Sequence, residues 1–115
     1  MPFDPELTQG ARNAVRTCLK IQAQEKVTLI ADEVSLEIAS ALASQVEEVG
    51  ARWQLFVLEQ LAPRPLTDMP AAVLADLETS QVSIFTVVAQ QNELRSRMQM
   101  TDVVNRRKIR HAHMV

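Results

Sequence analysis

The stretch Val82-Ser83-Ile84-Phe85-Thr86-Val87-Val88-Ala89 decides the fold class, because apolar side chains occupy nearly consecutive positions in it. A strand with one face in water alternates apolar and polar residues, whereas a strand covered on both faces does not. The earlier run Val27-Thr28-Leu29-Ile30-Ala31 has the same character. We therefore predict that both runs are central strands of a parallel sheet with helices on its two faces.

Segments with helical periodicity surround these two runs. Apolar residues from Leu7 to Leu19 form a stripe that predicts a leading helix, which Asp4-Pro5-Glu6 would begin. A second stripe runs from Ile38 to Val49, with Asp32 or Ser35 as its cap and Gly50 just past its end. Residues 51–58 then form the next predicted strand.

The second half of the chain repeats this alternation. Ala62-Pro63-Arg64-Pro65 must be a loop, and a short helix carrying residues 73–77 follows it. Residues 92–104 predict a last helix that Asn92 would cap, with Thr101-Asp102 as a point where it could restart. Residues 110–115 begin to alternate like a fourth strand.

Right-handed crossovers between parallel strands then give the strand order 2-1-3-4. The predicted fold class is α/β, a three-layer sandwich of Rossmann or flavodoxin-like type with a helix before its first strand. A length of 115 residues and a mass of 12.9 kDa correspond to one domain, residues 1–115.

Composition excludes several classes of function. A formal net charge of −2 provides no field for nucleic acid or an anionic membrane, and 3% aromatic residues provide no stacking platform for bases. No uncharged apolar run approaches the roughly 20 residues that span a bilayer. The single cysteine, Cys18, and the acidic residues near the N-terminus, where a signal peptide would be basic, predict a cytoplasmic protein.

The switch point between strands 1 and 3 is the expected place for a ligand, and the segments Asp32-Glu33 and Gln90-Gln91-Asn92-Glu93 lie there. The segments at this point contain no glycine, which excludes a dinucleotide or P-loop cradle. Paired carboxylates could hold Mg²⁺, but acidic residues also suit the positive N-terminus of a helix. We favour the capping role over a metal site.

His111 and His113 would point to one face of a strand and could share a metal ion. No third histidine or further cysteine completes such a site, so we favour a structural role for both. The basic residues 106–108 and 110 suit the C-terminal end of a helix and predict a solvated face. Cys18 lies in the apolar stripe of the first helix, where a thiol acts as a small apolar side chain.

Leu29-Ile30-Ala31-Asp32-Glu33 also looks like the start of a response-regulator receiver domain, whose acidic pair binds Mg²⁺. A receiver needs an acceptor aspartate at the end of its third strand, and Ala89-Gln90-Gln91 offers amides there. The leading helix does not fit that family either. The receiver likeness is therefore kept as an alternative at the level of fold.

Several stretches together resemble the N-terminal region of the metal-dependent aminopeptidases of the aminopeptidase T and S type, also called leucyl aminopeptidases. These stretches are residues 10–19 (GARNAVRTCL), Glu25-Lys26-Val27, Asp32-Glu33 and Arg110-His111-Ala112-His113-Met114. The resemblance implies a chain about three times this length, with a two-metal site of Glu, His and Asp ligands in a later domain. No position of this sequence matches those ligands.

The resemblance therefore implies a non-catalytic structural or oligomerisation domain, which is the N-terminal part of a longer aminopeptidase-like chain or a shortened relative. Zinc, cobalt or manganese and a peptide substrate are implied only for a full-length relative. The alternative is a stand-alone flavodoxin-like or receiver-like module that binds a ligand or transmits a signal. We also expect a homodimer, formed through the edge of strand 4 or through a sheet face that a missing last helix leaves uncovered.

Overall fold

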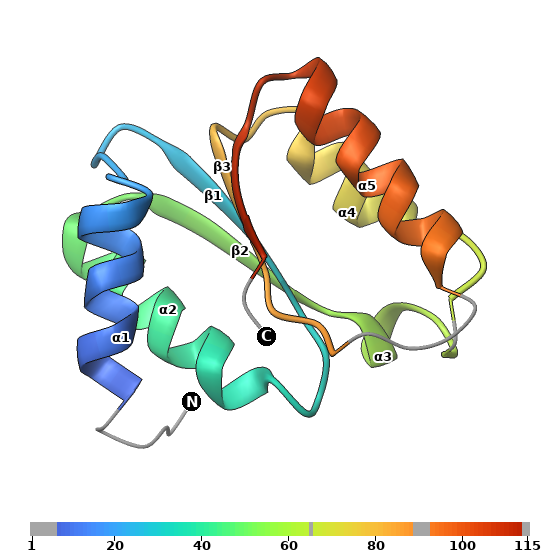
Figure 1. The fold of residues 1–115 in the computed structure, drawn as a ribbon, viewed down its shortest axis with the longest axis horizontal. Coiled ribbons are helices and arrows are strands. Elements are labelled where there is room, and N and C mark those ends of the chain that lie inside the picture. The colour runs from blue at the N-terminus through green and yellow to red at the C-terminus, as the bar shows by residue number, and fades with distance from the viewer. Residues whose placement is uncertain (1–6, 65, 89–92, 114–115) are drawn as a thin grey trace.

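The strands and helices were located in a computed structural model that describes residues 7–64, 66–88 and 93–113 (Figure 1). Within these residues the strands are β1 (Lys26–Ala31), β2 (Arg52–Val57), β3 (Val82–Phe85) and β4 (Arg110–His113). All neighbouring pairs are parallel, and the order is β2-β1-β3-β4. The sheet type and strand order predicted from the sequence are confirmed.

Helices cover both faces of the sheet (Figure 1). One outer layer contains α1 (Leu7–Asn13), its continuation as the π-helical turn η1 (Ala14–Cys18), and α2 (Leu36–Val49). The other contains α4 (Ala71–Leu77) and α5 (Leu94–Arg106). The short helix α3 (Leu58–Leu61), which the sequence did not predict, follows β2 directly. The result is the expected three-layer sandwich with a leading helix.

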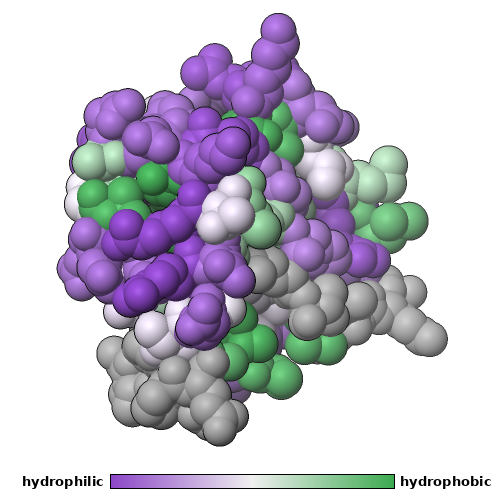
Figure 2. Space-filling view, turned by 60° about the vertical axis from the view of Figure 1, so that its left-hand side comes forward, coloured by the Kyte–Doolittle hydropathy of each residue, from purple (hydrophilic) through white to green (hydrophobic). Residues whose placement is uncertain are grey.

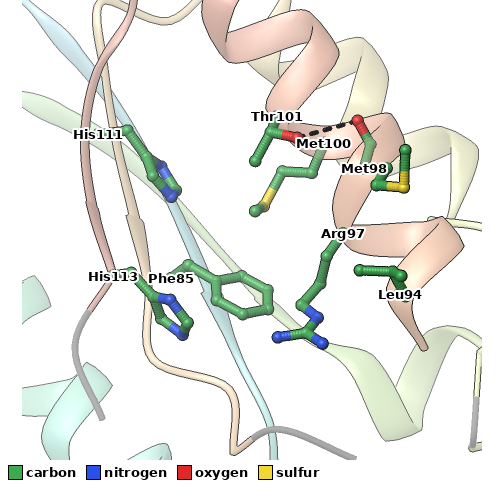
Figure 3. Close-up of a pocket in the computed structure, with 8 residues that line it drawn as sticks. All are labelled: Phe85, Leu94, Arg97, Met98, Met100, Thr101, His111 and His113. Atoms are coloured by element: carbon green, nitrogen blue, oxygen red, sulfur yellow. Dashed lines mark hydrogen bonds between the residues drawn. The ribbon is translucent and has the colours of Figure 1, made fainter. Parts of the chain in front are cut away.

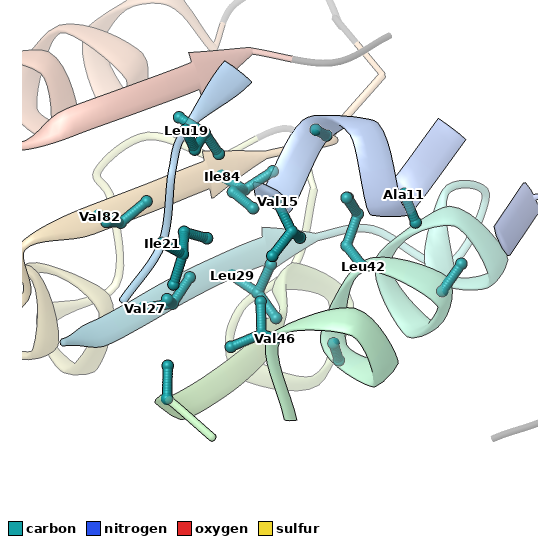
Figure 4. Packing of buried hydrophobic residues seen from close by; sticks show 14 residues of the cluster. Ala11, Val15, Leu19, Ile21, Val27, Leu29, Leu42, Val46, Val82 and Ile84 are labelled. Carbon is teal, nitrogen blue, oxygen red and sulfur yellow. The ribbon is translucent and has the colours of Figure 1, made fainter. Parts of the chain in front are cut away.

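Two apolar clusters, one on each side of the sheet, explain why the central strands are uniformly apolar. Leu29 and Ile84 face α1 and α2 (Figure 4), whereas Ile30 and Phe85 face α4 and α5. Each of these four side chains is at most 2% exposed, whereas the described surface seen in Figure 2 is largely hydrophilic, with separate apolar patches. Successive strand residues point to opposite faces, so a strand with helices on both sides needs apolar residues at successive positions.

The expectation of an uncovered face beside strands 3 and 4 is wrong for β3. Val82 and Ile84 are fully buried, in the same cluster as Val15 and Leu19 (Figure 4). The leading helix, α1 with η1, lies beside α2 and fills the layer that a helix after β4 would otherwise occupy. A trailing helix is therefore not needed to bury this part of the sheet.

The π-helical turn also corrects the placement of Cys18. The Leu19 N–H donates to the Ala14 carbonyl at 2.9 Å, five residues back instead of the usual four. The additional residue in the turn keeps Leu19 buried but rotates Cys18 out of the apolar stripe. Cys18 is exposed and unbridged.

Element boundaries follow the sequence with a few differences. Gly50 ends α2 in the left-handed conformation, at φ 94°, as its position predicted. Helix α5 runs unbroken from Leu94 to Arg106, so the restart at Thr101-Asp102 is wrong. Strand β3 ends at Phe85, four residues before the predicted end. The helix caps predicted at residues 4–6 and 92 lie outside the described residues.

None of the described helices is both long enough and apolar enough to cross a membrane.

Candidate functional site

A buried arginine, Arg64, occupies the carboxyl edge of the sheet at the switch point between β1 and β3. Its guanidinium lies 3.1 Å from Asp32 Oδ2, 3.3 Å from Glu59 Oε2 and, through Nε, 2.9 Å from Glu93 Oε2. The side chains of Arg64, Asp32 and Glu93 are 6%, 1% and 4% exposed, and that of Glu59 is 26% exposed. We call these four residues the Arg64 cluster.

Backbone groups bind the carboxylates of the Arg64 cluster as well. Asp32 Oδ1 accepts from the Ser35 N–H at 2.8 Å, and Asp32 Oδ2 accepts from the Val88 N–H at 2.9 Å. Glu93 Oε2 accepts from the Leu66 N–H at 2.7 Å. The Arg64 cluster therefore links the segments after β1, β2 and β3 to one another. The buried carboxylate oxygens of Asp32 and Glu93 already accept hydrogen bonds from within the chain.

These contacts determine the charge of the buried carboxylates. Burial alone would raise the pKa of Asp32, but hydrogen bonds from Ser35, Val88 and Arg64 outweigh it and lower that pKa. The pKa of Glu93 is lowered chiefly by its hydrogen bond with Arg64, against the opposing effect of burial. Both side chains are therefore carboxylates at neutral pH, and both pair with the same buried cation, the Arg64 guanidinium.

Asp32 and Glu33, the sequence-predicted acidic pair, have different surroundings. Asp32 is buried in the Arg64 cluster, whereas Glu33 is exposed and its backbone N–H donates to Glu59 Oε1 at 3.1 Å. Among the described residues, no three His, Cys, Asp or Glu side chains converge as a metal site would require.

His111 and His113 line a pocket of about 300 Å³ between β3, β4 and α5 (Figure 3). Both imidazoles lie on one face of β4, as their spacing of two residues predicted. The His113 ring meets the edge of Phe85 with the two centroids 5.0 Å apart. His111 Nδ1 lies 2.6 Å from the buried Ser83 hydroxyl. Burial lowers the pKa of His111, and the neighbouring His113 lowers it further.

Sequence reasoning missed two arginines that matter here. Arg64 reads from the sequence only as part of a proline-rich break, because two of its three acidic partners, Asp32 and Glu93, are 32 and 29 residues away. Arg97 reaches the pocket from α5, and its Nε is buried with no hydrogen-bond partner among the described residues (Figure 3). The available signal was its spacing, since Arg97 stands three residues before the buried Met100, on the inward face of α5.

The basic residues near the end of α5 form a solvated face, as predicted. Arg106 pairs with Glu78 at 2.7 Å, and Arg107 lies 3.7 Å from the same carboxylate, all three being exposed. Arg110 at the start of β4 pairs with Glu25. Arg106 and Arg107 therefore share one carboxylate, and Arg110 pairs with another.

Comparison with known proteins places the fold among larger enzymes. No protein-family model matches the sequence, and no curated protein matches it significantly. Among solved structures, the chain is similar to 2,5-dihydroxypyridine dioxygenase from Pseudomonas putida KT2440, at a TM-score of 0.65 and 12% identity over 99% of this chain. It is also similar to AmpT from Thermus thermophilus, at a TM-score of 0.61 and 14% identity over 94% of this chain. The chain spans 35% of each of those chains, and at these identities the likeness is one of fold.

Proposed function

We propose that this chain is a non-catalytic structural α/β domain of a larger metal-dependent enzyme of the aminopeptidase T and S type. The Arg64 cluster is the observation that carries this proposal. Parallel α/β folds usually bind and transform ligands beyond the carboxyl ends of their strands, at the switch point. In this chain a buried arginine and its carboxylates fill that place, and their hydrogen bonds join the loops after three strands. We infer that this edge of the sheet holds the loops in place and does not bind a ligand.

The similarity to parts of larger enzymes supports the same assignment. The fold recurs over about a third of a dioxygenase chain and about a third of the AmpT chain. A module that accompanies different chemistries is better explained as a scaffold than as a reaction centre. Zinc, cobalt or manganese and the peptide substrate belong, in this proposal, to the rest of such an enzyme. The single cysteine, Cys18, suits the reducing cytoplasm, where we place the protein.

The proposal includes homodimer formation through β4. This strand is at the edge of the described sheet, with β3 on one side only. An edge strand presents unpaired N–H and C=O groups that a second copy can pair with. The uncovered face that we first considered is filled by α1 and η1, so the edge carries the dimer proposal alone. Light scattering after gel filtration at tens of micromolar should report twice 12.9 kDa, and a concentration-independent monomer would contradict this part.

An activity assay tests the non-catalytic assignment. The purified chain is incubated with leucyl-p-nitroanilide and with zinc, cobalt or manganese in turn, while circular dichroism establishes that it is folded. We expect no release of nitroaniline, because the described residues contain no convergent set of metal ligands. Release that a chelator abolishes would show that the chain has its own catalytic site and would overturn the proposal.

A further inference from the structure

We propose that the pocket between β3, β4 and α5 binds a small monocarboxylate with an apolar body. Arg97 of this pocket lies one helical turn after Glu93 of the Arg64 cluster, and its charge contributes to lowering the pKa of that carboxyl. The inference does not depend on whether the chain belongs to a larger enzyme. Its walls combine one arginine and two histidines with apolar side chains. The full set of lining residues is Phe85, Leu94, Arg97, Met98, Met100, Thr101, His111 and His113.

Arg97 is the anchor for the carboxylate. Its Nε–H is buried and donates to no described residue, and a buried donor without an acceptor is unfavourable in a folded protein. The guanidinium extends from α5 towards the strands (Figure 3). A carboxylate that accepts from Nε and an adjacent Nη–H together would satisfy this donor in the paired geometry that arginine favours.

The opposite wall contains a second polar pair. The buried Ser83 hydroxyl lies 2.6 Å from His111 Nδ1, and either group can be the donor, depending on which ring nitrogen of His111 carries the hydrogen. Where the hydroxyl donates, a neutral imidazole carries its hydrogen on Nε2, the nitrogen left to meet a ligand. None of the eight lining residues is acidic, and Thr101 Oγ1 donates to the Met98 carbonyl at 3.0 Å. The charge of Arg97 and the absence of acidic residues from this lining therefore favour an anion.

The remaining lining residues indicate the size and polarity of the part of the ligand that carries the carboxylate. Phe85 and Met100, each 2% exposed, are apolar groups deep in the pocket. Leu94 and Met98 are 62% and 57% exposed, which places them at its mouth. A volume of about 300 Å³ is at the lower end of the range for ligand pockets. One permanent positive charge among apolar walls matches a monoanion with a ring or short chain better than a multiply charged phosphate.

A nuclear magnetic resonance titration with benzoate tests the proposal. Benzoate carries a carboxylate on an apolar ring, and benzamide is its neutral control of the same shape. In the ¹⁵N-labelled chain, benzoate should cause saturable shifts of the Phe85, Thr101 and His111 amides. The dissociation constant should be about millimolar, as suits a ligand of so few atoms. Benzamide should bind about tenfold more weakly, because it lacks the charge that Arg97 recognises.

Two matched arginine variants locate the charge recognition. Arg97→Gln should weaken benzoate binding about tenfold and remove the preference over benzamide. Arg95→Gln should leave both unchanged, since Arg95 is 71% exposed and pairs with Asp68 on the surface. Equal binding of benzoate and benzamide to the unmodified chain would overturn the proposal even if Arg97→Gln failed to fold. The proposal would also be overturned by amide shifts that do not saturate or that are not centred on the pocket. Binding of benzoate by Arg97→Gln as tightly as by the unmodified chain would overturn it as well.

Discussion

Replacing Arg64 with methionine should destabilise the fold far more than replacing any surface arginine. Methionine keeps much of the side-chain length but removes the charge and all the hydrogen bonds to Asp32, Glu59 and Glu93. The Asp32 and Glu93 side chains, 1% and 4% exposed, would then be buried carboxylates without a buried counter-ion. Removing one partner of such a pair costs about 3–5 kcal/mol. For a domain of this size, that corresponds to a fall in Tm of about 12–20 °C.

Chemical unfolding in urea and a thermal melt followed by circular dichroism would measure this loss. Arg95→Met is the control, because the Arg95–Asp68 pair is solvent-exposed and such pairs contribute at most about 1 kcal/mol. If Arg64→Met lowers the free energy of unfolding by no more than Arg95→Met does, the Arg64 cluster is not holding the three loops together. The structural role proposed for it would then be wrong.

The stability that Arg64→Met loses relative to the unmodified protein should depend on pH in a definite direction. The pKa values of Asp32 and Glu93 are lowered in the fold, so their contribution is present above the unfolded values of about 3.9 and 4.3. That contribution is lost as the pH falls through the lower folded values. In Arg64→Met, burial without the cation should raise both pKa values instead. The stability difference between the two proteins should therefore narrow from pH 7 to about pH 4, and a constant difference would refute the electrostatic cause.

Three further predictions concern single positions in the fold. Gly50→Ala should lower the free energy of unfolding in urea by about 1 kcal/mol, because φ is 94° at this position. Gly10→Ala inside α1 is the control and should be neutral or stabilising, because there is open space around Gly10. Equal effects of the two substitutions would contradict the backbone argument. Leu29→Ala should cost about 2–5 kcal/mol, since Leu29 is fully buried, and a loss below about 1 kcal/mol would mean that the core is loosely packed. Cys18 should react with a thiol reagent in the native protein as fast as in urea, and protection in the native state would place it back in the apolar stripe.

The sheet could be predicted from the sequence because its signals are local. Runs such as Val27–Ala31 and Val82–Phe85 are apolar at successive positions, and chain connectivity with right-handed crossovers then leaves few possible orders. The common face of His111 and His113 followed in the same way from the two-residue period of a strand. Each of these inferences needs only neighbouring residues and a general rule of geometry.

The Arg64 cluster could not be predicted because it brings together the separate segments that follow three strands. Arg64 lies 32 residues from Asp32 and 29 from Glu93, and no spacing rule connects such positions. Cys18 was misplaced for a different reason. Hydrogen bonding to the fifth preceding residue in η1, as from Leu19 to Ala14, shifts the helical period where the sequence shows an unbroken stripe.

The leading helix has a consequence for the order in which the protein is made. Every member of the cluster under α1 and α2, except Val82 and Ile84, lies within the first 51 residues. On a ribosome that exposes the chain from its N-terminus, this layer can therefore collapse onto β1 and β2 before β3 has been synthesised. The growing chain meanwhile presents one open flank of β1, which β3 later occupies between β1 and β4. Synthesis would be most vulnerable to aggregation in the interval between residues 57 and 82, when both helices of this layer have been made and that flank of β1 is still unpaired.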